Sequence, residues 1–236
     1  MKVSGGKTVY GASLGILMLE AQFPRIPGDM GNAETWPFPV QYRVVPNASP
    51  DRVVRHQAEG LLPAFIETAE DLVAHGVDGI TTNCGFLSLF QEQLTKAVPV
   101  PVAASSLMQV SLVNSLLPPG QRTGLLTISG STLTEQHLVA ANVPLETPIE
   151  TTEDGQEFSR AILDDEPQMD VSLARQDNVE AALRLKSKHR DLGAIVLECT
   201  NMTPYAADIQ EATQMPTYSM VSFVSWFHSG LVPRTY

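Results

Sequence analysis

The two cysteines of the chain stand in the same local setting. Cys84 follows the apolar run 79–83 and precedes an amphipathic helical pattern, and Cys199 follows the run 194–198 in the same way. We therefore expect each sulfur where a buried strand ends and a helix begins, at free backbone N–H groups and the positive end of the helix dipole. Such a position lowers the pKa of a thiol, which can then act as base, acid or nucleophile.

The surroundings of the two cysteines are duplicated. An apolar residue, Leu94 or Ile209, lies ten positions beyond each cysteine, and a proline then precedes another apolar run. The run 14–19 likewise matches 123–128, and the offsets are 109 residues at the glycines, 115 at the cysteines and 117 at the prolines. Three matches in the same order predict two similar lobes with one cysteine each. Since open α/β sheets bind ligands beyond the carboxyl ends of their strands, both thiols should face one cleft.

The two cysteines could also have other roles. A free cysteine is more often a small buried hydrophobic residue than a reactive group, and the duplication is what favours reactivity here. Two cysteines this far apart, with no histidine at ligand spacing, do not predict a zinc site, and no Cys-x-x-Cys motif is present. A Cys–His pair stays open, because any histidine could fold nearby. The histidines are His56, His75, His137, His189 and His228.

The elements that carry the cysteines indicate an α/β fold. Short apolar runs alternate with longer helical patterns, which is typical of a mostly parallel sheet with flanking helices. We expect strands at 14–19, 41–45, 79–83, 100–103, 124–129, 194–198 and 217–220. We expect helices at 51–75 with a break near Gly60 and Pro63, and at 87–97, 106–116, 132–141, 156–163, 171–189, 204–213 and 221–229.

The duplication also predicts how the chain divides. The first α/β lobe should comprise residues 1–104 plus 217–236 and carry Cys84, and the second should comprise residues 105–216 and carry Cys199. A pseudo-two-fold axis should relate the lobes, with the active site between them. The segment 24–39 contains four prolines and predicts a long irregular loop that either covers the cleft or forms a dimer contact.

Composition and charge limit the partners. Fifteen Lys and Arg against 26 Asp and Glu give a net charge of −11, and without a basic patch we expect no nucleic-acid binding. No apolar run reaches the roughly 20 residues of a membrane helix, so we expect no membrane partner. The five lysines lie near the terminus or on polar helix faces, which argues against a Schiff base with pyridoxal phosphate. They are Lys2, Lys7, Lys96, Lys186 and Lys188.

The first twenty residues imitate a secretory signal, because Lys2 and Lys7 precede the apolar stretch 9–19. Glu20 and Gln22, however, stand where small cleavage-site residues belong. The stretch also contains one of the duplicated runs. We therefore interpret it as the first strand and expect a cytoplasmic protein.

The two cysteine turns allow a resemblance to be stated. Residues 82–85 (Thr-Asn-Cys-Gly) and 198–201 (Glu-Cys-Thr-Asn), in two repeated α/β lobes, resemble the aspartate/glutamate racemase superfamily. That group includes glutamate, aspartate and hydantoin racemases, maleate cis-trans isomerase and arylmalonate decarboxylase. The resemblance implies a cofactor-independent enzyme in which Cys84 and Cys199 act as opposed base and acid. The decarboxylases keep one cysteine, so the presence of two argues against that branch.

The resemblance also suggests how a substrate carboxylate is held. The sequence Ser-Gly-Ser-Thr at 129–132 matches a Thr-x-x-Thr element and keeps hydroxyl donors, although helix N-capping would explain these residues as well. The asparagines beside the cysteines either bind a carboxylate or brace the turns. The expected substrate-binding residues are Asn83, Gly85, Ser129, Thr132, Thr200 and Asn201.

Four residues depart from the superfamily pattern or resist interpretation. Met18 and Leu19 stand where amino-acid racemases carry an Asp-Ser pair for the substrate amino group, and Asn201 replaces a histidine of glutamate racemases. Glu198 would be costly to bury alone, so it should pair with a donor or keep a raised pKa. Because side chains alternate along a strand, Glu198 should point away from Cys199, which favours a structural role.

The leading functional hypothesis is a racemase or epimerase that abstracts and returns a proton α to a carboxylate. Its substrate would be an amino acid such as aspartate or glutamate, or a hydantoin-like compound, and neither a cofactor nor a metal is expected. One alternative is a maleate-type cis-trans isomerase with a cysteine thiolate as nucleophile. Another is a non-catalytic protein that binds a small acid, and a homodimer is compatible with any of these.

Overall fold

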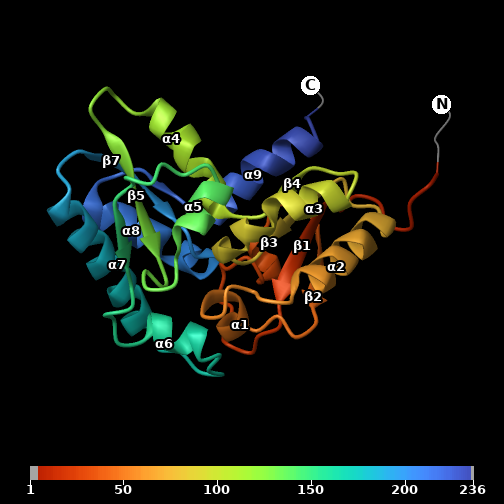
Figure 1. Ribbon diagram of the computed structural model, residues 1–236, viewed down its shortest axis with the longest axis horizontal. Helices are drawn as coiled ribbons and strands as arrows, with labels where there is room; N and C mark the ends of the chain where they lie inside the picture. Colours follow the sequence, from red (N-terminus) through yellow and green to blue (C-terminus); the bar gives the residue numbers. More distant parts are fainter. Residues whose placement is uncertain (1–4, 235–236) are drawn as a thin grey trace.

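Two four-stranded parallel sheets organise the protein in the computed structural model, which describes residues 5–234 (Figure 1). The first sheet has the order β2-β1-β3-β4 and the second the order β6-β5-β7-β8. The strands are β1 Leu14–Leu19, β2 Val40–Val45, β3 Gly79–Thr82, β4 Val102–Ala103, β5 Arg122–Thr127, β6 Ile149–Thr151, β7 Leu192–Leu197 and β8 Thr217–Tyr218. The identical strand orders confirm the α/β class and the duplication that the cysteine turns predicted.

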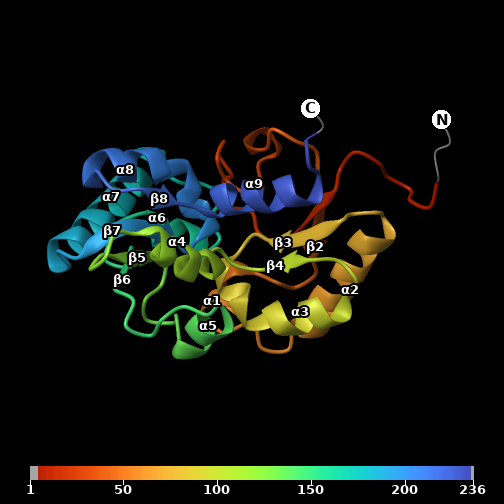
Figure 2. The ribbon, with the colours of Figure 1, turned by 90° about the horizontal axis from the view of Figure 1, so that it is seen from above.

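Helices cover both faces of each sheet. Figure 2 shows α9 on one side of the first sheet and α2 and α3 on the other. The α-helices are α1 Pro50–Val54, α2 Leu62–Ala74, α3 Gln91–Ala97, α4 Val110–Leu116, α5 Glu135–Ala140, α6 Phe158–Leu163, α7 Val171–Lys188, α8 Ala206–Thr213 and α9 Met220–Leu231. Short 3-10 helices are η1 Ala33–Thr35, η2 Gly85–Phe90, η3 Ser106–Gln109 and η4 Thr200–Tyr205.

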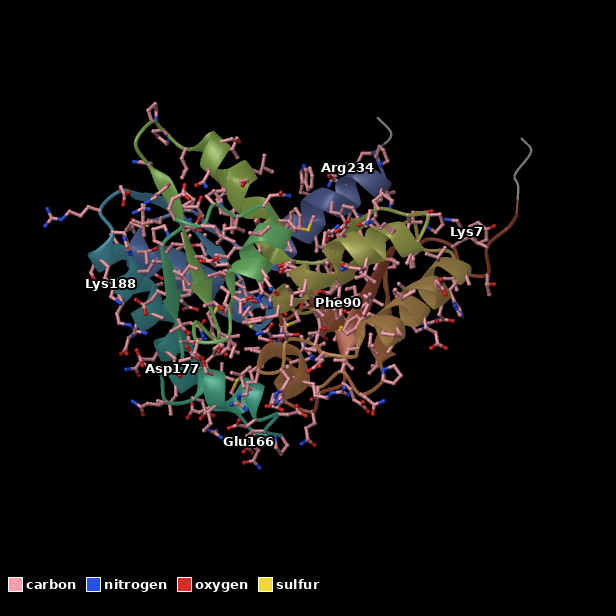
Figure 3. All side chains as sticks on the ribbon, in the orientation of Figure 1. Lys7, Phe90, Glu166, Asp177, Lys188 and Arg234 are labelled. Carbon is pink, nitrogen blue, oxygen red and sulfur yellow. The ribbon has the colours of Figure 1, made fainter. Side chains whose placement is uncertain are left out.

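Burial on both faces explains why the central strands β1 and β7 are apolar throughout. All six residues of β1 are buried, with Leu14 paired with Val40 of β2 and with Gly79 of β3. One large core contains Leu17 from the first sheet together with Leu126 from the second. The two halves therefore share a hydrophobic core, and side chains fill the region between them, with Phe90 near the middle of the molecule (Figure 3).

Several expected elements differ from those observed. The helix expected at 51–75 is divided into α1 and α2, with Gly60 at φ 72° between them, as the predicted break requires. Strand β6 was not predicted, since three residues centred on Glu150 form no apolar run. The first lobe was expected to include 217–236, but β8 pairs with β7 of the second sheet, and only α9 packs against β1. Lys2 and residues 235–236 lie outside the described residues.

The loop after β1 is ordered by its own hydrogen bonds. The Asp29 carboxylate accepts from the Arg25 guanidinium at 2.9 Å and from the Gly31 N–H at 2.7 Å. The Trp36 indole N–H donates to the Tyr42 hydroxyl at 3.0 Å. Gly28 packs against Pro204 of η4, so the loop reaches the second half of the molecule.

Within the described residues, none of the helices has the length and apolar character that crossing a membrane requires.

Candidate active site

Cys84 and Cys199 line the same cavity between the two halves of the protein. Cys84 follows β3 and is the N-cap of η2, and Cys199 follows β7 and is the N-cap of η4. The cavity has a volume of about 20 Å³, which is room for about one water molecule. Its walls are Leu19, Phe23, Pro50, Val54, Asn83, Cys84, Ile128, Ile162, Leu163, Glu198, Cys199 and Asn201.

The expectation of lowered thiol pKa values is wrong for this closed cavity. Burial raises the pKa of Cys84, the charge of Glu198 adds to that, and hydrogen bonds from the backbone at Phe86 and Leu87 only partly offset it. Burial and Glu198 likewise raise the pKa of Cys199 well above its usual value. The helices that start here are 3-10 turns of six residues, whose N-termini supply donors but do not compensate for the loss of water.

Glu198 is among the residues that line the cavity, although strand alternation predicted that its side chain points away from Cys199. Strand β7 ends at Leu197, so strict alternation no longer holds at Glu198. Its side chain is 0% exposed, and Oε2 accepts a hydrogen bond from the Thr127 hydroxyl at 2.8 Å. Oε1 has no hydrogen-bond partner among the described residues. Burial raises the pKa of Glu198 to about 7, although the Thr127 hydroxyl and the Ile128 backbone N–H oppose the shift.

Gly85, which was expected to bind substrate, instead makes room for Glu198. It is buried at the start of η2 and is not part of the cavity wall. A Cβ at this position would overlap the Glu198 carboxyl group and the Glu198 backbone carbonyl. The first cysteine turn therefore packs directly on the residue that precedes the second cysteine.

Asn83 and Thr200 link the two cysteine turns. The Leu19 N–H donates to Asn83 Oδ1 at 2.8 Å, which fixes the orientation of the amide. The Thr200 hydroxyl donates to the Asn83 carbonyl at 2.6 Å, so Thr200 braces the turn and is not part of the cavity wall. Asn83 does line the cavity, and its Nδ2 donates to no residue that the structure describes. This amide is free to donate to a ligand.

Asn201 connects the second cysteine to the loop after β1. Its Nδ2 donates to the Asp29 carboxylate at 2.5 Å, and its Oδ1 lies 3.5 Å from the Cys199 sulfur as hydrogen-bond acceptor. Asp29 is in turn paired with Arg25. Both ends of the Asn201 side chain are thus engaged, which favours a positioning role for Asn201 at Cys199.

Ser129 and Thr132 are not in the cavity wall with the cysteines. They line a neighbouring pocket of about 420 Å³, which shares Leu163 with the cavity. The Ser129 hydroxyl donates to the Glu153 carboxylate at 2.7 Å, and the Thr132 hydroxyl donates to Ser129 Oγ at 2.8 Å. These hydroxyls hold a carboxylate of the protein itself in this structure.

The remaining alternatives can be compared with the same geometry. None of the five histidines, all of which the structure describes, lines the cavity. A Cys–His pair is therefore not formed in this closed arrangement. The described part of the chain also contains no group of three or more His, Cys, Asp or Glu side chains that could hold a metal ion.

A set of hydrogen bonds joins the two halves beside the cavity and is called the clasp below. It was not predicted from the sequence. Asp165, just after α6 of the second half, accepts from the N–H groups of Gln22 and Phe23 at 2.7 and 3.2 Å. Arg55, just after α1, donates to the Asp164 carboxylate at 2.8 Å. These bonds hold Phe23 and the end of α6, which line the cavity together with the thiols. The two adjacent aspartates gave the only sequence signal, which is indistinguishable from an ordinary polar turn.

The fold places the protein in a defined structural class. Its two-sheet α/β architecture is shared with solved structures of racemases and a decarboxylase, and this is the fold that the resemblance of the cysteine turns implied. Allantoin racemase from Klebsiella pneumoniae is 19% identical with a TM-score of 0.65, and the match covers 93% of this chain and 88% of that chain.

Two further solved structures share this fold. Unliganded arylmalonate decarboxylase is 16% identical with a TM-score of 0.60, covering 95% of this chain and 94% of that chain. A glutamate racemase from Bacillus anthracis is 15% identical with a TM-score of 0.58, covering 94% and 84%. At these identities the likeness establishes the fold alone.

Among curated proteins the similarity is to lyases. A dimethylsulfoniopropionate lyase from Durusdinium sp. clade D is 26% identical over 234 residues, which cover 94% of this chain and 75% of that protein. Dimethylsulfoniopropionate lyase 7 from Emiliania huxleyi is 26% identical over 231 residues, which cover 93% and 67%. No family model matches the sequence.

Proposed function

We propose that this protein is a cofactor-independent lyase that removes a proton α to the carboxylate of a small sulfonium acid of the dimethylsulfoniopropionate type and expels the β-sulfide. The observation that carries the proposal is the pair of thiols in the wall of one mostly apolar cavity, which must widen from its volume of about 20 Å³ to admit this substrate. The similarity to dimethylsulfoniopropionate lyases over 94% of the chain supports this substrate class over an amino acid or hydantoin.

The reaction needs one base and a leaving group. A thiolate takes the α-proton, the C–H electron pair forms the Cα=Cβ bond, and the Cβ–S bond breaks with its electrons on sulfur. The products are acrylate, neutral dimethyl sulfide and a protonated thiol. The free Asn83 amide is suited to donate to the substrate carboxylate, where negative charge increases as the proton leaves.

The substrate itself helps to form the base. Burial raises the pKa of both thiols, so they are protonated at neutral pH when no cation lies beside them. A sulfonium ion beside them favours the thiolate, because an opposite charge within about 4–6 Å stabilises the ionised form. Closure of the cavity strengthens that effect by excluding water.

The second candidate is a two-base racemase. The presence of one cysteine at the same place in each of the two duplicated halves favours it. Racemisation begins with the same proton abstraction but returns a proton from the opposite face. It therefore requires both cysteines, whereas elimination requires one base. This difference separates the two candidates by experiment.

The test is to incubate the protein with dimethylsulfoniopropionate and measure dimethyl sulfide by gas chromatography and acrylate by NMR. We expect release of both products. The rate should fall at least about 100-fold, the scale of a positioned base, in Cys84→Ser or in Cys199→Ser, depending on which thiol is the base. Ser88→Ala, a buried change in η2 outside the cavity, should keep most of the activity.

A parallel assay in D₂O distinguishes the racemase. Absence of sulfide release by the wild-type protein would overturn the lyase proposal. Deuterium incorporation at the α-carbon of aspartate, glutamate or allantoin, lost in both cysteine variants, would establish the racemase instead.

A further inference from the structure

Glu198 is an unusual component of the cavity wall. It is the only carboxyl group among the residues that line the cavity, and none of those residues is Lys, Arg or His. Its side chain is fully buried, and the Thr127 hydroxyl holds one oxygen in place. The other oxygen, Oε1, is buried and has no partner among the described residues. That oxygen packs against Gly85, so Glu198 acts on a ligand in the cavity through its charge and not through a hydrogen bond.

The position of Glu198 relative to the thiols limits what the ligand can be. Glu198 is the charged group with the largest effect on both Cys84 and Cys199. A second anionic group beside it would be repelled in this water-poor space, whereas a cation would be attracted. The protein would then have a cation-attracting side at Glu198 and a carboxylate-binding amide at Asn83.

We propose that ionised Glu198 is the counterion for the cationic centre of the substrate and thereby a specificity-determining residue. The inference rests on the proposed lyase function. It assigns recognition of the sulfonium group to Glu198, because no other residue of the cavity wall carries a charge. It predicts preference for zwitterions over dianions such as maleate. Gly85 serves this arrangement, since any larger residue would displace the carboxylate.

The test compares two ligands of almost the same shape. Dimethylsulfoniopropionate carries a sulfonium, and 4-methylpentanoate has an uncharged CH in place of the S⁺. Binding is measured by calorimetry in full-length protein with Cys84→Ser and Cys199→Ser, so that no turnover occurs. Glu198→Gln is the test variant. Glu150→Gln is the matched control, because Glu150 is also largely buried in the same half but pairs with Lys188 outside the cavity.

We expect the protein with Glu198 to bind the sulfonium ligand at least about 30-fold more tightly than its uncharged isostere, the scale for a close buried charge pair. Glu198→Gln should remove most of that preference by weakening the sulfonium ligand alone, and Glu150→Gln should keep it. An unchanged preference in Glu198→Gln would overturn the counterion role even if the wild-type protein releases sulfide. Failure of the wild-type protein to cleave and to bind the sulfonium acid would overturn the lyase proposal and this inference together.

Discussion

At the residue scale, burial affects the pKa of the two thiols more than their position at helix N-termini does. The N–H groups at the start of η2 and η4 are present as expected, yet burial raises the pKa of Cys84 and Cys199. The duplicated apolar runs allowed both cysteines to be found from the sequence. The position of Glu198 could not be found in this way, because it depends on where β7 ends and on the missing side chain at Gly85.

The raised pKa of Glu198 predicts a pH-dependent stability. Unfolded Glu198 releases its proton near pH 4.5, whereas burial raises its pKa to about 7 in the folded protein. Between these values the folded state holds the extra proton, so the free energy of unfolding falls as pH rises, by up to about 3 kcal/mol. Glu198→Gln should remove this loss and be more stable than wild type at pH 8, with little difference near pH 4.5. Urea unfolding at both pH values measures it.

The matched variant for this measurement is Glu150→Gln. Ion pairing with Lys188 helps to lower the pKa of Glu150, although burial opposes the shift, so its removal should not stabilise the protein at pH 8. A Glu198→Gln protein with the same pH dependence as wild type would contradict the assignment of a buried carboxyl group with a raised pKa.

At the element scale, the segment after β1 and the end of α6 are held together beside the cavity that contains the thiols. The prolines of segment 24–39 predicted an irregular loop, and the structure shows it in contact with η4 and Asn201. Its pairing partners could not be predicted, because hydrogen bonds between residues more than 140 positions apart leave no periodic signal. The 3-10 start of the helices after the cysteines and the short strand β6 escaped prediction for a similar local reason, since neither has a full period of apolar residues.

The clasp can be opened by one substitution. Asp165 has φ 53°, a conformation that glycine adopts easily, so Asp165→Gly removes the carboxylate without straining the backbone. Loss of the bonds to Gln22 and Phe23 should increase local opening and raise the rate at which iodoacetamide modifies Cys84 and Cys199 by about tenfold or more. Intact-protein mass spectrometry over time measures that rate.

Asp165→Asn keeps an acceptor oxygen and tolerates the same backbone angle, so its thiols should react at nearly the wild-type rate. Equal rates in Asp165→Gly and wild type would mean that the thiols are reached by another route.

At the scale of the whole molecule, the two halves are a duplicated unit with a common core. The sequence offsets predicted the repeat, and both sheets have the same strand order. The crossing of the chain between the halves was predicted less well, since β8 belongs to the second sheet while α9 returns to the first. Packing of apolar surfaces decides that choice, and Met220 and Phe223 of α9 show no preference for one sheet in the sequence alone.

The contact between the halves predicts the effect of one added methyl group. Gly85→Ala would place Cβ against the carboxyl group and backbone carbonyl of Glu198, and a backbone atom cannot move aside as a flexible side chain can. We expect a loss of about 1–3 kcal/mol in the free energy of unfolding, measured in urea. Gly230→Ala in α9 meets no atom within 4 Å and should be neutral or slightly stabilising. Similar stability of both variants would show that the halves separate easily at Gly85.

The water-sized, apolar cavity has a consequence for the lifetime of the enzyme. Acrylate, the product of the proposed elimination, is an electrophile that reacts with thiolates far faster than with thiols. Once the sulfide has formed, the positive charge that favours ionisation is gone, and burial again keeps both thiols protonated. The thiols are thus protonated, and unreactive toward acrylate, at the moment when acrylate lies beside them. The mass of the protein should therefore stay unchanged through many turnovers.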